Sequence, residues 1–161
     1  MEIRKMLIGD YEEVYALWTS CSGMGLNDLD DSREGIAKFL TRNPDTCFVA
    51  IEQGGVVGVI LAGHDGRRGY IYHTSVHPDY RKRGIATKLV NTAMEALEGC
   101  GINKVALVVF ARNQGGKFVL GKDGIHDQGR LDLQKQNDQG DAPNRHVDDR
   151  VDESSVLRLG V

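Results

Sequence analysis

The chain has 161 residues, a length that suits a single domain. Apolar residues make up 40% of it, enough for a core, and the formal net charge of −3 provides no positive field for nucleic-acid binding. No apolar run is long enough to span a membrane, and the first residues do not resemble a signal peptide. We therefore expect a cytoplasmic protein with neither a nucleic-acid nor a membrane partner.

Two elements of the first quarter of the chain have clear sequence signals. Residues 1–7 alternate enough to form a first strand, with Ile3 and Met6 facing inward. Asp10 is placed to cap a helix from Tyr11, and Glu13 lies where a capping box needs it. That helix has an apolar stripe of three residues, Val14, Leu17 and Trp18.

A loop over residues 20–30 leads to a second predicted helix. Either Asp31 or Ser32 caps it, and it continues to about Leu40. Its buried side consists of Ile36, Phe39 and Leu40. The three cysteines of the chain, Cys21, Cys47 and Cys100, are odd in number and lack the spacing of a metal site, so we expect buried thiols in a reducing compartment and no metal.

Three strands follow, separated by glycine-containing turns. We expect them at residues 46–52, 56–63 and 70–76, joined by turns at 53–55 and 64–68, so that they form an antiparallel meander. Gly58 and Gly63 mark either close approach of another group or simple bulges. Within the last strand, period two places Tyr70 and Tyr72 on one face with Val76, and His73 on the other.

A tight basic turn and a long helix come next. Pro78 ends the strand ladder, and the sequence Arg81-Lys82-Arg83-Gly84-Ile85-Ala86 opens an amphipathic helix that reaches Gly99. The apolar run 104–110 then predicts a fifth strand, parallel to the fourth because a helix connects the two. The fold class is therefore α/β (α+β), with a mixed, mostly antiparallel sheet.

The basic turn has the features of a phosphate site. The first amides of a helix lack intrahelical partners and carry the positive end of the helix dipole. Gly84 and the small Ala86 allow an anion to approach the backbone, and three cationic side chains precede them. The alternative is a solvated basic turn before an ordinary helix, because short glycine signatures have low specificity.

The segment V-H-P-D-Y-R-K-R-G-I-A-T, between a strand and a long helix, resembles the acetyl-CoA signature of the GCN5-related N-acetyltransferases. The family pattern, Arg or Gln, two residues, Gly, one residue, then Gly or Ala, is met by Arg81, Gly84 and Ala86. The chain looks most similar to small bacterial members related to the ribosomal-protein alanine acetyltransferase. The resemblance implies a GNAT-like sheet with helices on both faces, whose parallel fourth and fifth strands splay apart to admit the thioester.

The resemblance also implies which residues hold acetyl-CoA, the co-substrate. The turn's amides hold the pyrophosphate, the end of the fourth strand contacts the acetyl and pantetheine parts, and an Asn after the fifth strand contacts the arm. Carried over, these are Thr74, Ser75, Val76, Arg81, Lys82, Arg83, Gly84, Ile85, Ala86, Thr87 and Asn113. By the same analogy, the Val76 N–H polarises the acetyl carbonyl.

The catalytic base is less well defined. Amine acetylation needs a group that removes the ammonium proton, directly or through water. In many relatives that group lies on the fourth strand, which has no carboxylate here. Tyr72 is our candidate because it shares the parity of Val76, and Tyr70 and His73 are the alternatives. Packing of these aromatic rings on the sheet explains them equally well.

The first two helices and their connection form the acceptor wall in the resembled family. Met24 and Leu26 therefore face substrate or simply fill the core. Four acidic residues cluster here, Asp28, Asp30, Asp31 and Glu34. They are a solvated acidic loop or attract a cationic amine, such as a peptide N-terminus or a polyamine.

The chain changes character after Gly116. Residues 1–116 read as the acetyltransferase domain, whereas 117–161 have no sustained period and few apolar residues, and so predict a disordered tail. Reading compatible codons one base later from Lys117 permits N-L-F-W-E-K-T-G-F, which is similar to the family's next motif, so we interpret the tail as frame-shifted. The Tyr that protonates the thiolate in several relatives is replaced by Trp in the shifted frame and by Leu120 as written.

Three functions are compatible with these features. The first is an N-acetyltransferase that uses acetyl-CoA on a primary amine by direct attack. The second is a CoA-binding or sensing domain without turnover, and the third is a phosphate-binding module unrelated to CoA. A homodimer is also possible, because the fifth strand would have a free edge.

Overall fold

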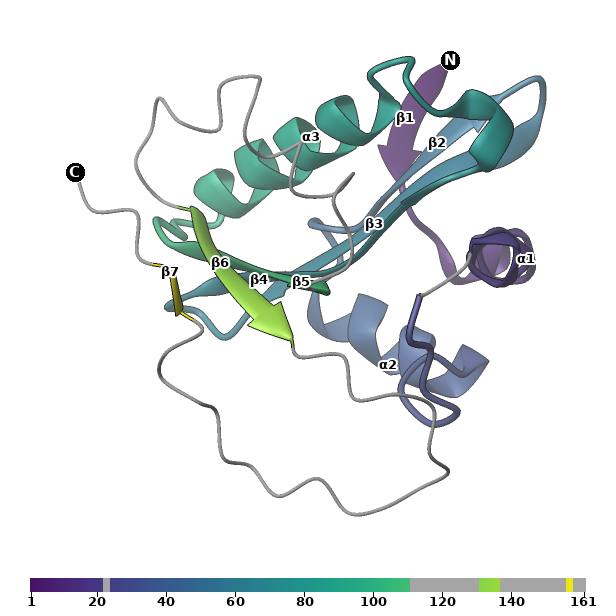
Figure 1. Ribbon diagram of the computed structural model, residues 1–161. Helices are drawn as coiled ribbons and strands as arrows, with labels where there is room; N and C mark the ends of the chain where they lie inside the picture. Colours follow the sequence, from purple (N-terminus) through teal and green to yellow (C-terminus); the bar gives the residue numbers. More distant parts are fainter. Residues whose placement is uncertain (22–23, 111–130, 137–155, 158–161) are drawn as a thin grey trace.

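The computed structural model describes residues 1–21, 24–110, 131–136 and 156–157. The roles predicted for Asn113 and Leu120 lie outside these residues. The protein contains one sheet with helices on both faces, α3 on one and α1 and α2 on the other (Figure 1). The strands, in their order across the sheet, are β1 (Glu2–Lys5), β2 (Phe48–Glu52), β3 (Gly55–His64), β4 (Gly69–Val76), β5 (Val105–Phe110), β6 (Leu131–Gln136) and β7 (Val156–Leu157).

The strand directions confirm the predicted mixed sheet. Strands β1 to β4 form an antiparallel meander, and β5 runs parallel to β4 after the α3 crossover. Strand β6 is parallel to β5, and β7 is antiparallel to β6. Strand β6 therefore covers the outer edge of β5 along its length. The prediction of a free edge, on which we based a possible homodimer, is wrong.

The helices are α1 (Tyr11–Ser20), α2 (Arg33–Arg42) and α3 (Ile85–Gly99), with short 3-10 turns η1 (Ile8–Asp10) and η2 (Pro78–Tyr80). Of the two possible caps for α2, Ser32 fills the role: its hydroxyl accepts the Gly35 N–H at 3.0 Å. Hydroxyl capping of this kind satisfies one of the unpaired amides at a helix start.

The capping box predicted for α1 is wrong. Asp10 adopts helical backbone angles and makes no side-chain cap. Its carboxylate instead accepts hydrogen bonds from the two terminal guanidinium nitrogens of Arg4 and from the Leu7 N–H, and these bonds lower the pKa of Asp10. Glu13 accepts the Val56 N–H at 2.9 Å, so it connects α1 to the start of β3. Both carboxylates therefore bind groups outside α1 in place of the helix's own amides.

Two hydrophobic clusters, one on each face, anchor the sheet. The α3 face buries Ile71, Val76 and Leu89, among others, and the α1/α2 face buries Trp18, Ile36 and Leu61, among others. The apolar stripes predicted for the three helices are the surfaces that pack here. Two of the three cysteines, Cys21 and Cys47, are buried as expected, but Cys100 is exposed because it follows the last turn of α3.

Glycines permit close packing at two points on β3. A Cβ on Gly58 would lie 3.1 Å from Leu89 Cδ1 and 3.2 Å from Ile85 Cγ2, so its absence lets α3 approach the sheet. On the opposite face, a Cβ on Gly63 would lie 2.8 Å from the side-chain amide of Asn43. Close approach therefore explains both positions.

Gly63→Ala should destabilise the protein by about 1–3 kcal/mol, the usual cost of overpacking. The added methyl would displace the Asn43 amide, which accepts the His64 N–H at 3.0 Å and donates to the Phe39 carbonyl at 3.3 Å. Urea unfolding measures the change. Gly9→Ala is the control, because its Cβ would meet nothing within 4 Å. Equal stability of the two variants would contradict the packing role.

Candidate acyl-CoA site and acceptor wall

The turn before α3 forms a concave row of backbone amides. Lys82 and Gly84 both have left-handed angles, with φ of +61° and +75°, on either side of Arg83. Backbone of this kind turns successive N–H groups toward one point, which makes an anion site. Within the described part of the chain, no acceptor is hydrogen-bonded to the N–H groups of residues 82–87. A Cβ on Gly84 would meet nothing within 4 Å, so the row is also sterically open.

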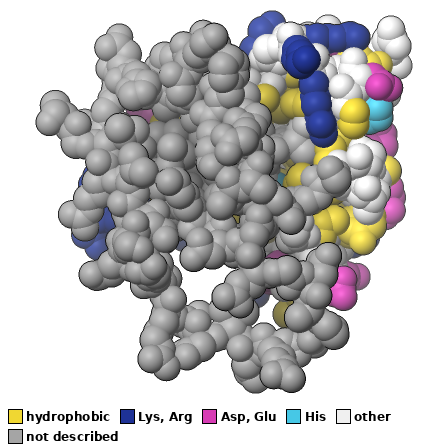
Figure 2. Space-filling view, in the orientation of Figure 1, with side chains coloured by type: hydrophobic (Ala, Val, Ile, Leu, Met, Phe, Trp, Pro, Cys, Tyr) yellow, Lys and Arg dark blue, Asp and Glu magenta, His cyan; other side chains and the backbone are white. Residues whose placement is uncertain are grey.

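The cationic side chains around this turn have different roles. Arg81 bends back, and its Nε donates to the Val76 carbonyl at 3.1 Å. Arg83 lies over the Tyr80 ring, 4.8 Å from its centroid, and donates to the Asp79 carbonyl and to Glu52. Lys82 is exposed, with no ion pair among the described residues. Figure 2 shows Lys and Arg side chains gathered at the top of this face, over the loop into α3 in Figure 1.

Strand β4 separates from β5 before it ends. The pairing covers only Gly69 to Ile71 on β4, although β4 continues to Val76 and β5 to Phe110. Among the described strands, none pairs with the second half of β4 on that side. This is the splayed parallel pair that the sequence resemblance implies.

The backbone of that second half presents free amides on its β5 side. The His77 N–H donates to the Val57 carbonyl at 2.9 Å. Bonded and non-bonded pairs alternate in an antiparallel ladder, so Gly58 and Val76 form a non-bonded pair, and Thr74 lies in the next one. Their N–H groups point away from β3. The Arg81 bond to the Val76 carbonyl agrees with this orientation.

Two hydroxyl groups beside these amides have no hydrogen-bond partner among the residues that the structure describes. Thr74 Oγ1 and Ser75 Oγ are buried without a hydrogen bond. Unsatisfied buried polar atoms are uncommon, and they indicate a missing partner such as a ligand or water. Two of the residues predicted to contact the pantetheine arm are thus among the three that have an unpartnered buried side-chain atom in the described chain, the third being Trp18 through its Nε1. Ile85, by contrast, is buried in the α3 core and offers only its backbone N–H.

A β-bulge changes the faces of the three candidate bases. Leu61 pairs with His73 and Ala62 with Ile71, so Tyr72 is an extra residue in β4. Tyr72 packs on Phe39 of α2, and His73 packs on Trp18 of α1. Both side chains therefore lie on the α1/α2 face. The prediction that His73 takes the opposite face from Tyr72 is wrong, as is the parity between Tyr72 and Val76, whose side chain joins the α3 cluster.

The two neighbouring candidates have different environments. Tyr72 is 51% exposed, and its pKa is raised by burial of the hydroxyl and by the charges of Tyr70 and Asp65. A raised pKa makes a phenol a poorer base near neutral pH. Tyr70 lies beside it, with ring centroids 6.2 Å apart.

His73 is fixed by a carboxylate from the α1–α2 connection. Its Nε2 lies 2.9 Å from Asp31 Oδ1, and both side chains are mostly buried. The other oxygen of Asp31 accepts the Asn27 N–H at 2.7 Å. Burial raises the pKa of Asp31, but the hydrogen bonds with His73 and Asn27 outweigh it, so the pKa lies below its ordinary value. Sequence reasoning missed this pair because 42 positions separate the two residues.

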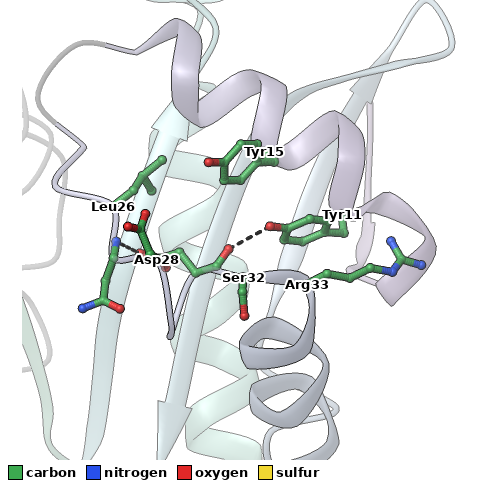
Figure 3. A pocket seen from close by; sticks show the side chains of 8 residues that line it. Tyr11, Tyr15, Leu26, Asp28, Ser32 and Arg33 are labelled. Carbon is green, nitrogen blue, oxygen red and sulfur yellow. Dashed lines mark hydrogen bonds between the residues drawn. The ribbon is translucent and has the colours of Figure 1, made fainter.

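The connection between α1 and α2 also surrounds a shallow pocket of about 190 Å³. In Figure 3, Tyr15 and Tyr11 form one side and Leu26 and Asp28 another. None of the residues predicted to hold acetyl-CoA lines it. Met24 and Leu26 pack against the α1/α2 cluster, which supports core filling, although Leu26 also borders the pocket.

In the described residues we find no group of three or more His, Cys, Asp or Glu side chains arranged to hold a metal ion. Nor does any helix of the described chain combine the length and apolar character that crossing a bilayer requires.

Open amides at a helix start, next to a strand that separates from its parallel neighbour, are the features that the sequence resemblance implies for an acyltransferase fold. Residues 11–118 match the model of the acetyltransferase (GNAT) family. The chain is 38% identical to "Acetyltransferase SG1711" of Sodalis glossinidius over 142 residues, which cover 80% of this chain and 99% of that protein. The chain therefore belongs to the GNAT acetyltransferase family, which confirms the sequence resemblance.

Solved structures support the same fold. Ribosomal-protein-alanine N-acetyltransferase from Brucella melitensis superposes with a TM-score of 0.57 at 20% identity, over 74% of this chain and 88% of that one. Diaminobutyrate acetyltransferase EctA from Paenibacillus lautus, solved with L-2,4-diaminobutyric acid and coenzyme A, gives a TM-score of 0.63 at 22% identity, over 74% and 71%.

We expect Asp31 to contribute stability that depends on acid. Its pKa is lower in the folded protein than in the unfolded chain, so the contribution is present above the unfolded value, near 4, and disappears as the pH falls through the folded value. At neutral pH, Asp31→Asn should cost about 1–3 kcal/mol.

Urea unfolding of wild type and Asp31→Asn across pH 2–7 measures this dependence. The difference between the two proteins should shrink as the pH falls below about 4. Subtracting the two curves removes the titration of the other carboxylates. A difference that stays constant down to pH 2 would show that the Asp31 carboxylate gains nothing from its partners.

Proposed function

We propose that this protein binds acetyl-CoA and transfers the acetyl group to a primary amine by direct attack. The observation that carries the proposal is the row of unpaired N–H groups at residues 82–87, which continues from the free backbone edge of β4. A ligand with a phosphate group at one end and a thioester at the other needs both features side by side: the amide row for the phosphate and the free strand edge for the thioester arm. Family membership supports acetyl transfer, and the relatives solved with CoA support its use as co-substrate.

The residues divide by the part of acetyl-CoA that they would contact. The amides of Lys82 to Thr87 would bind the pyrophosphate, with Lys82 and Arg83 adding charge at the opening. Thr74, Ser75 and Val76 would line the pantetheine and acetyl end. The hydroxyls of Thr74 and Ser75 are buried there without a hydrogen-bond partner among the described residues. Arg81 supports this end indirectly, because its guanidinium holds the Val76 carbonyl.

The chemistry requires two proton transfers. A base takes one proton from the ammonium group, and the neutral nitrogen then attacks the acetyl carbon. The Val76 N–H stabilises the oxyanion that forms. Collapse breaks the carbon–sulfur bond, and the second nitrogen proton passes to the CoA thiolate, directly or through water. The products are the N-acetylated amine and CoA-SH.

Among the three candidate bases on β4, the contacts favour His73. An imidazole suits proton transfer near neutral pH, and Asp31 holds this one in place. Tyr72 remains the competing candidate. His73 lies three residues, roughly 10 Å of strand, before Val76, so the proton would travel through at least one water molecule.

The α1–α2 connection supports a cationic amine as the acceptor. Exposed Asp28 and Asp30 and the buried Asp31 make this wall acidic, which suits a cationic amine. Two of the structural relatives are named for a protein N-terminal alanine and for a small diamine. A peptide N-terminus and a small diamine are therefore the two substrates to test first.

Gly84→Asp should weaken acetyl-CoA binding at least about tenfold, because a carboxylate would occupy the position of the pyrophosphate. The space around Gly84 is open, and its φ of +75° strains a side chain there, but aspartate adopts left-handed angles more readily than most residues, so the fold should survive with some loss of stability. Isothermal titration of the full chain with acetyl-CoA and with ATP measures binding. Gly9→Asp makes the same charge change in η1, away from the amide row, and should bind acetyl-CoA normally.

Release of CoA thiol in the presence of amines completes the test. The panel contains a peptide with a free N-terminal alanine, 2,4-diaminobutyrate and a polyamine. We expect turnover with at least one of them. Acetyl-CoA binding without any turnover would instead favour a sensing domain, and ATP binding as tight as acetyl-CoA binding would favour a general phosphate module.

A further inference from the structure

We propose that Asp31 is a positioning residue that orients His73 as the proton acceptor for the amine. This inference rests on the proposed acetyl transfer. It begins from the hydrogen bond of 2.9 Å between His73 Nε2 and Asp31 Oδ1, which joins the centre of β4 to the acceptor wall.

The ionisation of Asp31 determines which nitrogen of His73 is free. A carboxylate that is ionised can only accept hydrogen bonds. Asp31 is ionised at neutral pH, so the hydrogen of the shared bond must be on Nε2 of His73. The neutral ring then has its lone pair on Nδ1, and Nδ1 is the atom that can take a proton. Nε2 holds the ring, and Nδ1 performs the transfer.

The ring cannot turn freely about this bond. Trp18 packs against it, with ring centroids 5.3 Å apart, and Leu61 lies opposite on β3. Among the described contacts of His73, Asp31 is the only charged group. Trp18 from α1 and Leu61 from β3 carry no titratable group.

Asp31 is itself fixed from two directions. Its second carboxylate oxygen accepts the Asn27 N–H at 2.7 Å, and its backbone carbonyl accepts the Tyr11 hydroxyl at 2.9 Å. Tyr11 belongs to α1, and Asn27 to the connection between α1 and α2. A fixed carboxylate fixes the imidazole that it holds, so the ring is positioned before substrate arrives.

The bulge at Tyr72 places the competing candidate on the same face as His73. His73 pairs in register with Leu61, whose side chain belongs to the α1/α2 cluster, so the imidazole faces Asp31. Without the extra residue, strand alternation would place Tyr72 on the opposite, α3 face. Tyr72 contacts Phe39 and has no carboxylate partner among the described residues.

Spectroscopy tests the inference without enzyme activity. The full chain, labelled with ¹⁵N-histidine, reports the tautomer of each ring, and His73→Gln assigns the signal. We expect the Nε2–H form of His73 in wild type near pH 8, and a mixture of tautomers in Asp31→Ala, which removes the acceptor. An Nδ1–H form in wild type would overturn the inference.

Turnover tests the role in catalysis. With the alanine peptide as acceptor, His73→Gln should lower kcat about 10²-fold, the lower range for a general base. Its rate should then rise with pH, because only amine that is already neutral reacts. Asp31→Asn keeps an oxygen for the bond but loses the charge, so kcat should fall about tenfold and the acidic limb of the profile should move to lower pH.

The controls separate the possible failures. Glu12→Gln removes an exposed carboxylate of α1 that pairs with Arg33 and should leave kcat and the profile unchanged. A larger loss in Tyr72→Phe than in His73→Gln, or an unchanged profile in Asp31→Asn, would overturn the inference while acetyl transfer stands. A chain that binds acetyl-CoA and acetylates none of the three amines overturns both proposals.

Discussion

The early end of β4–β5 pairing is the constraint on which the site depends. The two strands pair at three positions only, and from there to Val76 β4 is paired with β3 but not with β5. Unpaired strand amides are unfavourable unless water, protein or ligand satisfies them. The same strand then turns through η2 into the open amides before α3, so one continuous piece of backbone presents donors first in extended and then in left-handed geometry.

The arrangement also explains why the sheet tolerates the gap. Strands β3 and β4 are bonded through the whole length of β4, and the two helical layers pack on both faces of this pair. Gly58 and Gly69 lie against α3 side chains at distances that would crowd a Cβ, so the helix is held close to the sheet. The core thus fixes β4 from three sides and leaves only the β5 side open.

Much of the fold could be predicted from the sequence. The apolar periods of the three helices, the Gln53-Gly54 turn and the basic glycine turn all act through local backbone preferences, which a sequence displays directly. Strand β6 was missed because only Leu131 and Leu133 stand out among polar residues, and a two-residue β7 gives no signal. The Asp10 cap failed because Arg4, six positions earlier, competes for the carboxylate.

The candidate site was predicted unevenly for a related reason. The row of open amides at residues 82–87 could be located from Gly84 and its neighbours, since it is built from consecutive residues. The faces of Tyr72 and His73 could not, because a bulge depends on pairing with β3 and leaves no pattern in β4 itself. Likewise, nothing local connects Asp31 with His73, whereas helix capping offered a sufficient explanation for an aspartate at that position.

The burial of Asp31 is best understood through what its carboxylate costs. Taking a charge out of water is unfavourable, and a buried ion pair often stabilises a protein no better than apolar residues of the same size. Tyr11 and Trp18 of the apolar α1/α2 cluster lie beside the Asp31–His73 pair, so packing alone does not require a charge at this position. A carboxylate that receives two hydrogen bonds, one of them from an imidazole on the strand that leads to the candidate acyl-CoA site, gives orientation in addition to stability. In the mechanism that we propose, acetyl transfer to an ammonium group requires an oriented proton acceptor, and this requirement would explain why a charge is kept where packing alone does not need one.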